Sequence, residues 1–350
     1  MEYKSNPRLA FHSSAPAGWR GNPFEDKEFK YVKNAYRPDW KSAVKMVLSG
    51  NPQREEKKAD TWTPEVSAGV TYLEDRSRDW IVWLGHACFL MQFNGLRFLT
   101  DPQLTGMPFI PRRVSPPFSY DDIRGVDYLL LSHDHRDHVD KKCIKAICAN
   151  NPIRKILCPL GLSNLIGSWV GKTPIEEAGW YQIFDTPDTG LRITFLPGQH
   201  WCRRGLTDFN RSLWGSFMLE VGDGGAAAGA KEVEEIRHTV YFGGDSAKTG
   251  YWAEIGAMFP AIDIAILGIG AYKPDYIMEP VHANPLQAFG GYQDLKATYW
   301  WPMHHGTYDL SNEPASEPIR WAERLMEDAG LSAQLLQPAV NEPYLLESER

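Results

Sequence analysis

From about residue 80 onward, short apolar runs bounded by turn residues alternate with segments of helical periodicity. Such short β-prone runs predict buried strands, whereas apolar residues spaced by three and four predict helices. The Asn94-Gly95 pair predicts a tight hairpin, because both central positions of a type I′ turn require a positive φ. The predicted strands are 80–84, 88–93, 96–100, 128–131, 155–158, 193–196, 216–221, 239–242, 262–267 and an aromatic strand from 300, and the predicted helices are 141–149, 285–292 and 318–329. This alternation is typical of an α/β protein with a mixed sheet.

The first 75 residues differ in composition and are rich in Pro, Lys and Trp. One short amphipathic helix is predicted over residues 40–48. Its apolar face holds Trp40, Val44, Val47 and Leu48. The charged run 54–58 is interpreted as a solvated connector, and the Gly/Ala-rich segment 222–231 as a flexible loop between two strands. We interpret the first 75 residues as an arm packed on a domain.

Composition limits the kinds of partner and the redox compartment that we expect for this protein. Lys and Arg total 37 against 44 Asp and Glu, so the net charge is −7 at pH 7. Affinity for nucleic acid comes largely from neutralisation of its phosphates by basic residues. Because acidic residues outnumber basic ones in this chain, no nucleic-acid partner is expected. The five cysteines contain no CxxC pair, which fits a reducing compartment or free buried thiols better than a disulfide framework.

Neither a targeting segment nor a membrane span is predicted. Residues 1–6 have no apolar core and do not resemble a secretory signal. The longest apolar stretch, 261–272, is too short for a bilayer and contains Asp263. We expect a cytoplasmic protein, or one that is peripheral on a membrane surface.

The strongest chemical pattern places His133, His135, Asp137 and His138 within six residues, directly after a predicted apolar strand. Neutral imidazole and carboxylate are ligands that zinc prefers. The end of a strand followed by a turn can direct several of these side chains at one point. The spacing therefore indicates a metal site rather than a His-rich surface loop. The other acid of the run, Asp134, is expected to face solvent.

Three more candidate ligands stand just after predicted apolar strands, beside Gly or Pro. They are His200, Asp245 and His304. One such residue alone would more often be a structural polar group. Three of them downstream of the first motif make coincidence a poor explanation, and they supply enough ligands for two metal ions.

With these motifs the sequence resembles the metallo-β-lactamase superfamily of binuclear hydrolases, and within it the branch of N-acyl-phosphatidylethanolamine-hydrolysing phospholipase D. The matching segments are WLGHA at 83–87, LTDP at 99–102, SHDHRDH at 132–138, QHWCRR at 199–204, LWGS at 213–216, FGGD at 242–245, GIGAY at 268–272, His282 and HHGT at 304–307. The resemblance covers about residues 80–331. It departs from the branch at His305, where the branch usually has Trp, and in a longer insertion at 222–237.

The resemblance implies a four-layer αββα sandwich with a binuclear metal site in the cleft between its sheets. It also implies two zinc ions per chain, one held by His133, His135 and His200, the other by Asp137, His138 and His304, with Asp245 as the bridge. Two zinc ions roughly 3.5–4 Å apart share a hydroxide that attacks phosphorus or carbonyl carbon. We assign residues 76–340 to this catalytic domain, residues 1–75 to the arm and residues 341–350 to a C-terminal tail.

His282 is the candidate general acid and contact for the substrate phosphate, and the alternative is an exposed loop histidine. Tyr272 is a candidate substrate-binding residue. It and the tryptophans near the ligand segments would line an apolar groove, or they simply pack in the core. Those tryptophans are Trp201, Trp214, Trp252, Trp300 and Trp301.

Four further residues are predicted to support the site. Asp101 would orient a ligand imidazole, and His86 would be a buried, hydrogen-bonded structural histidine. His305 adjoins a ligand and would form part of the pocket wall. Cys202 would be a buried small hydrophobe rather than a zinc ligand.

Two hydrolase hypotheses follow, with different substrates. The first is a phosphodiesterase of the phospholipase D type acting on N-acyl-phosphatidylethanolamine-like glycerophospholipids. The second is a hydrolase of a small soluble ester such as a sugar-phosphate lactone. A nuclease is disfavoured by the acidic charge, and a structural zinc protein by a ligand set that is not Cys-rich. The aromatic and basic residues of the arm permit a peripheral membrane contact or a homodimer without requiring either.

Overall fold

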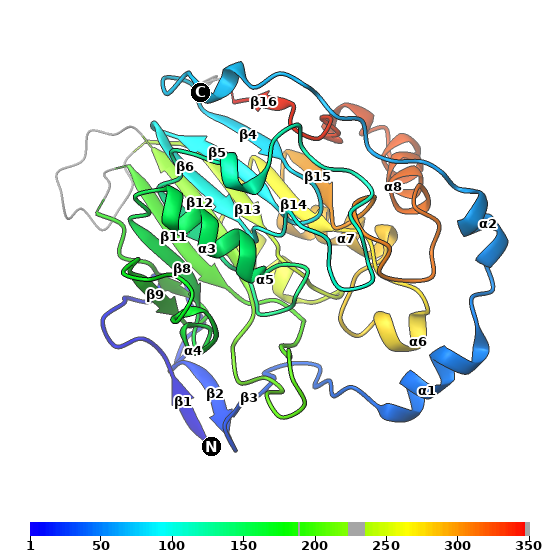
Figure 1. Ribbon diagram of the computed structural model, residues 1–350. Coiled ribbons are helices and arrows are strands. Elements are labelled where there is room, and N and C mark those ends of the chain that lie inside the picture. The colour runs from blue at the N-terminus through cyan, green and yellow to red at the C-terminus, as the bar shows by residue number, and fades with distance from the viewer. Residues whose placement is uncertain (188–189, 223–234, 347–350) are drawn as a thin grey trace.

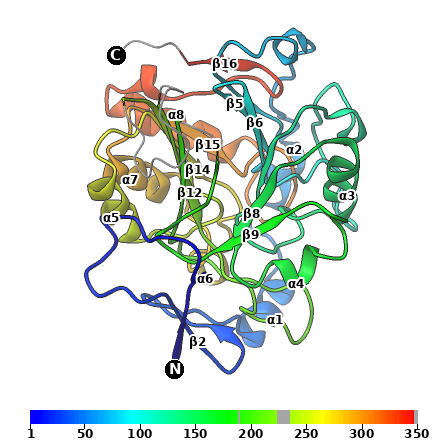
Figure 2. The same cartoon turned by 90° about the vertical axis from the view of Figure 1, so that its left-hand side faces the viewer.

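The computed structural model describes residues 1–187, 190–222 and 235–346. Two mixed β-sheets lie face to face in it (Figures 1 and 2). The first sheet contains, in spatial order, β10 (Gln182–Ile183), β11 (Leu191–Leu196), β12 (Ser216–Gly222), β13 (Ile236–Phe242), β14 (Ile264–Gly268) and β15 (Tyr299–Met303). The second contains β16 (Pro343–Leu345), β4 (Trp80–Trp83), β5 (Phe89–Phe93), β6 (Leu96–Thr100), β7 (Tyr128–Leu130), β8 (Lys155–Pro159) and β9 (Ile175–Ala178).

Helices cover the outer face of each sheet (Figure 2). On the side of the second sheet lie α3 (Lys141–Asn150) and α4 (Ser163–Ile166). On the side of the first sheet lie α5 (Tyr251–Met258), α7 (Pro285–Leu295) and α8 (Glu317–Asp328). The short α6 (Asp275–Met278) precedes α7. These layers form the αββα sandwich that the sequence predicted.

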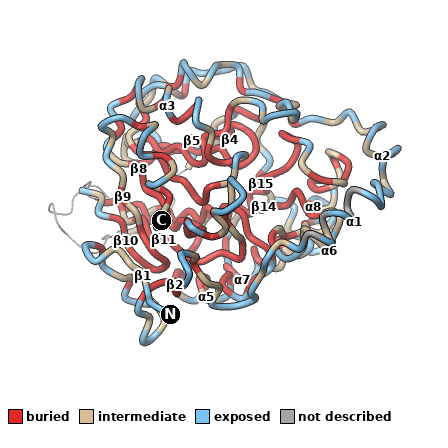
Figure 3. Tube along the Cα trace, turned by 60° about the horizontal axis from the view of Figure 1, so that its bottom comes forward, coloured by how far each residue is buried: buried red, intermediate tan, exposed pale blue. Residues whose placement is uncertain are grey.

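Strand β4 shows why both faces of the second sheet are buried. Its side chains alternate between two cores, because successive residues of a strand point to opposite faces. Ile81 and Trp83 pack into the core between the sheets, whereas Trp80 and Val82 pack into the core beneath α3. Figure 3 shows this buried interior inside a more exposed perimeter. All four residues of the strand are therefore apolar.

Local sequence signals account for several boundaries. Asn94 and Gly95 have φ values of 49° and 74°, so the predicted hairpin between β5 and β6 is confirmed. Helix α3 begins where the Asp140 side chain accepts from the Cys143 amide. Asn284 and Gln287 form a capping box at the start of α7. The predicted helices at 141–149, 285–292 and 318–329 are confirmed as α3, α7 and α8.

The N-terminal segment forms its own small sheet and then runs around the sandwich (Figure 1). That sheet is ordered β1 (Glu2–Lys4), β2 (Asn22–Glu25) and β3 (Glu28–Phe29). The Asn6 amide donates to the Gln182 side chain at 2.8 Å, which joins this segment to β10. Helix α1 (Trp40–Ser49) confirms the predicted helix. Val44 and Leu48 of its predicted apolar face are 46% and 80% exposed.

Two segments have structure that the sequence pattern did not specify. The charged run 54–58, interpreted as a solvated connector, lies in helix α2 (Arg54–Ala59), which buries none of its residues. Good helix formers with Glu early and Lys late favour a helix even without burial. In the predicted tail 341–350, β16 pairs with β4 as an edge strand. Most of the predicted loop 222–231 and of the insertion 222–237 lies outside the described residues.

Candidate metal centre

Loops that follow the strands bring the predicted metal ligands together at one edge of the sandwich. His133 to His138 follow β7, and His200, Asp245 and His304 follow β11, β13 and β15. The turn between β4 and β5 adds His86. All seven residues predicted as ligands belong to two groups whose nitrogen and oxygen atoms lie within 4.8 Å of one another.

The first group consists of His133, His135, His200 and Asp245. His135 Nδ1 lies 3.0 Å from His133 Nε2 and 3.1 Å from His200 Nε2. Three imidazole nitrogens therefore face one another, and a single ring proton cannot serve both contacts at once. Nitrogens that converge in this way are suited to bind one cation.

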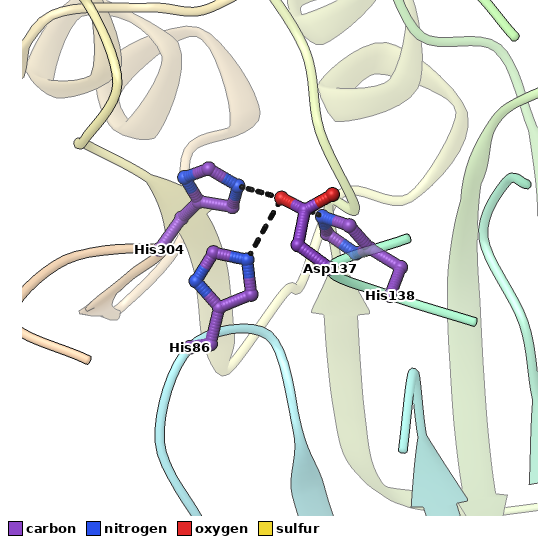
Figure 4. Close-up of side chains that lie close together, drawn as sticks. All are labelled: His86, Asp137, His138 and His304. Atoms are coloured by element: carbon purple, nitrogen blue, oxygen red, sulfur yellow. Dashed lines mark hydrogen bonds and ion pairs between the residues drawn. The ribbon is translucent and has the colours of Figure 1, made fainter. Parts of the chain in front are cut away.

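The second group consists of His86, Asp137, His138 and His304. The Asp137 carboxylate lies between the rings of His86 and His304, and His138 lies beside it (Figure 4). The Asp137 Oδ2 atom is 3.1 Å from His86 Nε2, 3.4 Å from His304 Nε2 and 3.6 Å from His138 Nε2. His86, expected as a supporting residue, thus contributes an atom to the group itself.

Asp245 lies between the two groups. Its Oδ2 atom is 3.1 Å from His138 Nε2 and 3.2 Å from His304 Nε2. The same oxygen is 3.8 Å from both His133 Nε2 and His200 Nε2. The position is the one that the predicted bridging role requires.

Orphaned polar atoms show that these residues fit metal ions. Buried polar atoms normally have hydrogen-bond partners. Among the described residues, His135 Nε2, His304 Nδ1 and Asp245 Oδ1 have none. Imidazole and carboxylate without cysteine form an open donor set typical of catalytic rather than structural zinc. The geometry is consistent with two metal sites that share Asp245.

Outer partners fix the ligand rings. His138 Nδ1 lies 2.8 Å from Asp101 Oδ2, as predicted for a residue that orients an imidazole. Asp101 also accepts from the Ser132 amide at 2.8 Å. His200 Nδ1 donates to the Val281 carbonyl at 2.7 Å. In both histidines the Nε2 atom is left to face the cluster.

Electrostatics of the cluster separate its histidines into two kinds. Burial alone would lower the pKa of His304, but Asp245 and Asp137 raise that pKa to about 9. The same two carboxylates raise the pKa of His138 well above its usual value. Burial and neighbouring histidines hold the pKa of His133 well below its ordinary range. Protons therefore compete with any cation for the ring nitrogens of His138 and His304.

His282 lies at the rim of the cluster. Its Nδ1 atom is 3.8 Å from Asp245 Oδ2, and 13% of its side chain is exposed. The ring lies 5.0 Å from that of His200 and 5.1 Å from that of His304. Burial lowers its pKa to about 4.

One predicted placement is wrong. Asp134 does not face solvent but is 4% exposed and accepts from the Arg203 amide at 3.0 Å. Tyr272, the candidate substrate-binding residue, is buried, and its hydroxyl donates to Glu317 at 2.5 Å. In both cases a partner far along the chain decides where the side chain points.

Two further predictions concern residues beside the ligands. His305 turns away from the cluster and stacks between Trp62 and Trp83, with ring centroids 6.1 and 5.2 Å away. Cys202 is fully buried, and its thiol donates to the Leu213 carbonyl at 3.4 Å. Neither belongs to the candidate metal groups of the described residues.

Sequence reasoning missed Arg204. Its Nη1 atom donates to the carbonyls of Asp134 and Val139 at 2.8 Å and of His135 at 3.3 Å. The guanidinium thus ties the segment after His200 to the loop that carries four candidate ligands. Its place in the QHWCRR segment, four residues after a predicted ligand, was the available signal.

Comparisons with known proteins agree with the fold. Residues 96–305 match the family model described as a β-lactamase superfamily domain. An N-acyl-phosphatidylethanolamine-hydrolyzing phospholipase D 1 from Caenorhabditis elegans is 30% identical over 312 residues, which are 83% of each chain. A UPF0173 metal-dependent hydrolase from Hyperthermus butylicus is 26% identical over 253 residues, 71% of this chain and 93% of that one. A solved metallo hydrolase from Ignicoccus hospitalis shares the fold, with a TM-score of 0.56 at 17% identity over 77% of this chain and 99% of that one.

The sandwich, its histidine and aspartate cluster and these similarities define a metal-dependent hydrolase. The chain belongs to the metallo-β-lactamase superfamily, near the branch of the N-acyl-phosphatidylethanolamine-hydrolysing phospholipases D. Within the described part of the chain, no helix is both long and apolar enough to cross a bilayer.

Proposed function

We propose that this protein is a zinc-dependent phosphodiesterase of the phospholipase D type that hydrolyses N-acyl-phosphatidylethanolamine-like glycerophospholipids. The observation that carries the proposal is the 30% identity to the Caenorhabditis elegans phospholipase, which extends over 83% of both chains. The clustered donor atoms support it, because hydrolysis of a phosphodiester needs strong stabilisation of developing negative charge.

The residues have distinct parts in this proposal. His133, His135 and His200 would hold one zinc ion, Asp137, His138 and His304 the other, and Asp245 would contact both. Bound there, zinc ions would lower the pKa of water and polarise a phosphate oxygen. Asp101 and the Val281 carbonyl keep the rings of His138 and His200 turned so that Nε2 faces inward.

His282 would bind the substrate phosphate as a neutral donor. Its pKa of about 4 makes the uncharged ring the dominant form near pH 7, and a neutral imidazole donates one N–H. We therefore assign His282 to orientation of the phosphodiester rather than to protonation of the leaving group. Its backbone amide donates to the Met278 carbonyl at 2.8 Å, which ties it to α6.

A peripheral membrane contact is supported by α1. The helix exposes Val44 and Leu48 and also carries Lys41 and Lys45, a mixture suited to the interface of an anionic bilayer. The Lys45 ammonium lies 4.1 Å from the ring centre of Tyr276 on α6. Because α6 leads into His282, a bilayer at α1 would present lipid headgroups close to the metal centre.

The test is turnover by the full chain loaded with zinc. N-acyl-phosphatidylethanolamine in mixed micelles should release phosphatidic acid, measured by mass spectrometry. Asp245→Asn should abolish turnover while circular dichroism stays unchanged, and Asp294→Asn, an exposed substitution on α7, should leave turnover intact. Activity that survives in Asp245→Asn would refute the bridging role.

A small soluble ester is the second candidate substrate, because the similarity to a UPF0173 metal-dependent hydrolase over 93% of that chain supports a hydrolase without specifying a lipid. A sugar-phosphate lactone should therefore be assayed beside the lipid. Turnover of the lactone together with inert lipid would overturn the phospholipase proposal and leave a hydrolase of soluble esters.

A further inference from the structure

A cavity that is lined in part by His305 is separate from the candidate metal ligands. It has a volume of about 370 Å³ and is formed by the segment after α2, the start of α8 and the strand that precedes His305. None of the seven candidate ligands lines it. Its size is within the range of small-molecule sites, which is roughly 300–1,000 Å³.

The walls of this cavity combine aromatic rings with carboxylates. Trp62, Trp83 and Trp301 contribute indole rings. Its rim carries Glu65, Glu323, Glu342 and Arg320. Together these four residues have a formal charge of −2. Aromatic faces and carboxylates both attract organic cations, and Trp is the strongest aromatic partner.

A buried polar atom at the wall lacks a partner. His305 is 7% exposed and lines the cavity. Its Nδ1 atom has no hydrogen-bond partner among the described residues. Buried polar atoms left unpaired are uncommon, and an imidazole nitrogen can accept a hydrogen bond from an ammonium N–H.

The cavity is also connected to the metal cluster through one carbonyl. Trp83 Nε1 donates to the His86 carbonyl at 2.9 Å. The amide of His304 donates to the same oxygen at 3.2 Å. A ligand that shifts the Trp83 ring therefore disturbs the His86 carbonyl. This carbonyl belongs to one residue of the cluster, His86, and accepts from the amide of another, His304.

We propose that this cavity binds a small aliphatic primary ammonium compound and that its occupancy alters the metal centre. The indole rings contact the alkyl part and the cationic head, the glutamates at the rim balance the charge, and His305 Nδ1 accepts one ammonium N–H. Because the site is separate from the metal cluster, the proposal does not depend on which ester the enzyme hydrolyses.

The binding test uses the zinc-loaded full chain and a matched pair of probes. Cyclohexylammonium and cyclohexanol have nearly the same shape, so calorimetric titration isolates the effect of the charge. Cyclohexylammonium should bind at least fivefold more tightly than cyclohexanol. Equal binding of the two, or no binding of the amine, would overturn the proposal.

Variants locate the site. The double substitution Glu65→Gln and Glu323→Gln should weaken amine binding at least fivefold, and Trp62→Ala should weaken it as well. Glu327→Gln, an exposed change on α8 outside the cavity, should have no effect. A double variant that folds normally and still binds like the parent would show that the amine binds elsewhere.

The coupling needs a readout other than turnover. In protein loaded with Co²⁺ instead of zinc, saturating cyclohexylammonium should shift the visible absorption bands of the metal, and cyclohexanol should not. Bands that stay unchanged at saturation would refute the link through Trp83 and the His86 carbonyl.

Discussion

Replacement of Arg204 by Met should loosen the loop that carries four of the candidate metal ligands. The arginine donates to the Asp134 and Val139 carbonyls at 2.8 Å and to the His135 carbonyl at 3.3 Å. Met keeps most of the apolar stem and removes all three hydrogen bonds. The loop then loses these three contacts with the segment that follows His200, and the bond from the Arg203 amide to Asp134 remains.

The magnitude follows from the two short contacts. A hydrogen bond to a charged group contributes about 1.5–3 kcal/mol, so two of them give about 3–6 kcal/mol. Arg204 is only partly buried, so water can replace part of this in the variant. We expect the free energy of unfolding to fall by about 2–4 kcal/mol and zinc affinity to fall by about 10–100-fold, as for loss of outer partners of metal ligands.

Two measurements check this expectation. Urea unfolding of chelator-stripped protein gives the change in stability, and zinc titration against a competing chelator gives the change in affinity. Arg204→Lys, which keeps the charge but can reach fewer carbonyls, should lie between parent and Arg204→Met. Arg203→Met is the matched control, because the Arg203 side chain donates to the Gly205 carbonyl rather than to the ligand loop. An Arg204→Met protein with parental stability and zinc affinity would refute the reasoning.

Three further predictions address other links of the structure. Asp101→Ala removes the partner of His138 Nδ1 and should weaken zinc binding about 10–100-fold, measured by chelator competition; unchanged affinity would contradict it. Burial lowers the pKa of His12, so the unfolded chain binds more protons below about pH 6.5 and the free energy of unfolding falls as the pH drops. His12→Asn should flatten that dependence between pH 7.5 and 5.5 in urea unfolding, and an identical slope would exclude His12 as its source. Leu48→Glu places a charge on the exposed face of α1 and should reduce sedimentation with anionic vesicles several-fold, whereas equal sedimentation would argue against contact through α1.

Short-range patterns predicted most of the sandwich, because they depend on each strand and its own faces. The strands from β4 to β8 read as apolar runs since both of their faces are buried. Short or half-exposed elements carry no such pattern. Strand β10 has two residues, and β16 has no buried residue, so their place in the sheets depends on pairing with distant strands rather than on their own composition.

The sequence by itself predicted the candidate ligands, because H-x-H-x-D-H and the three residues that follow apolar strands are local patterns. The loops that carry these residues follow strands of both sheets and meet at one edge of the sandwich. Only the tertiary structure decided which neighbours complete the site. His86 reaches Asp137 across 51 residues, and Glu317 takes the Tyr272 hydroxyl from 45 residues away. Asp134 is buried by the segment around Arg203. Side-chain direction in loops is set by such long-range partners, and periodicity along the chain contains no information about them.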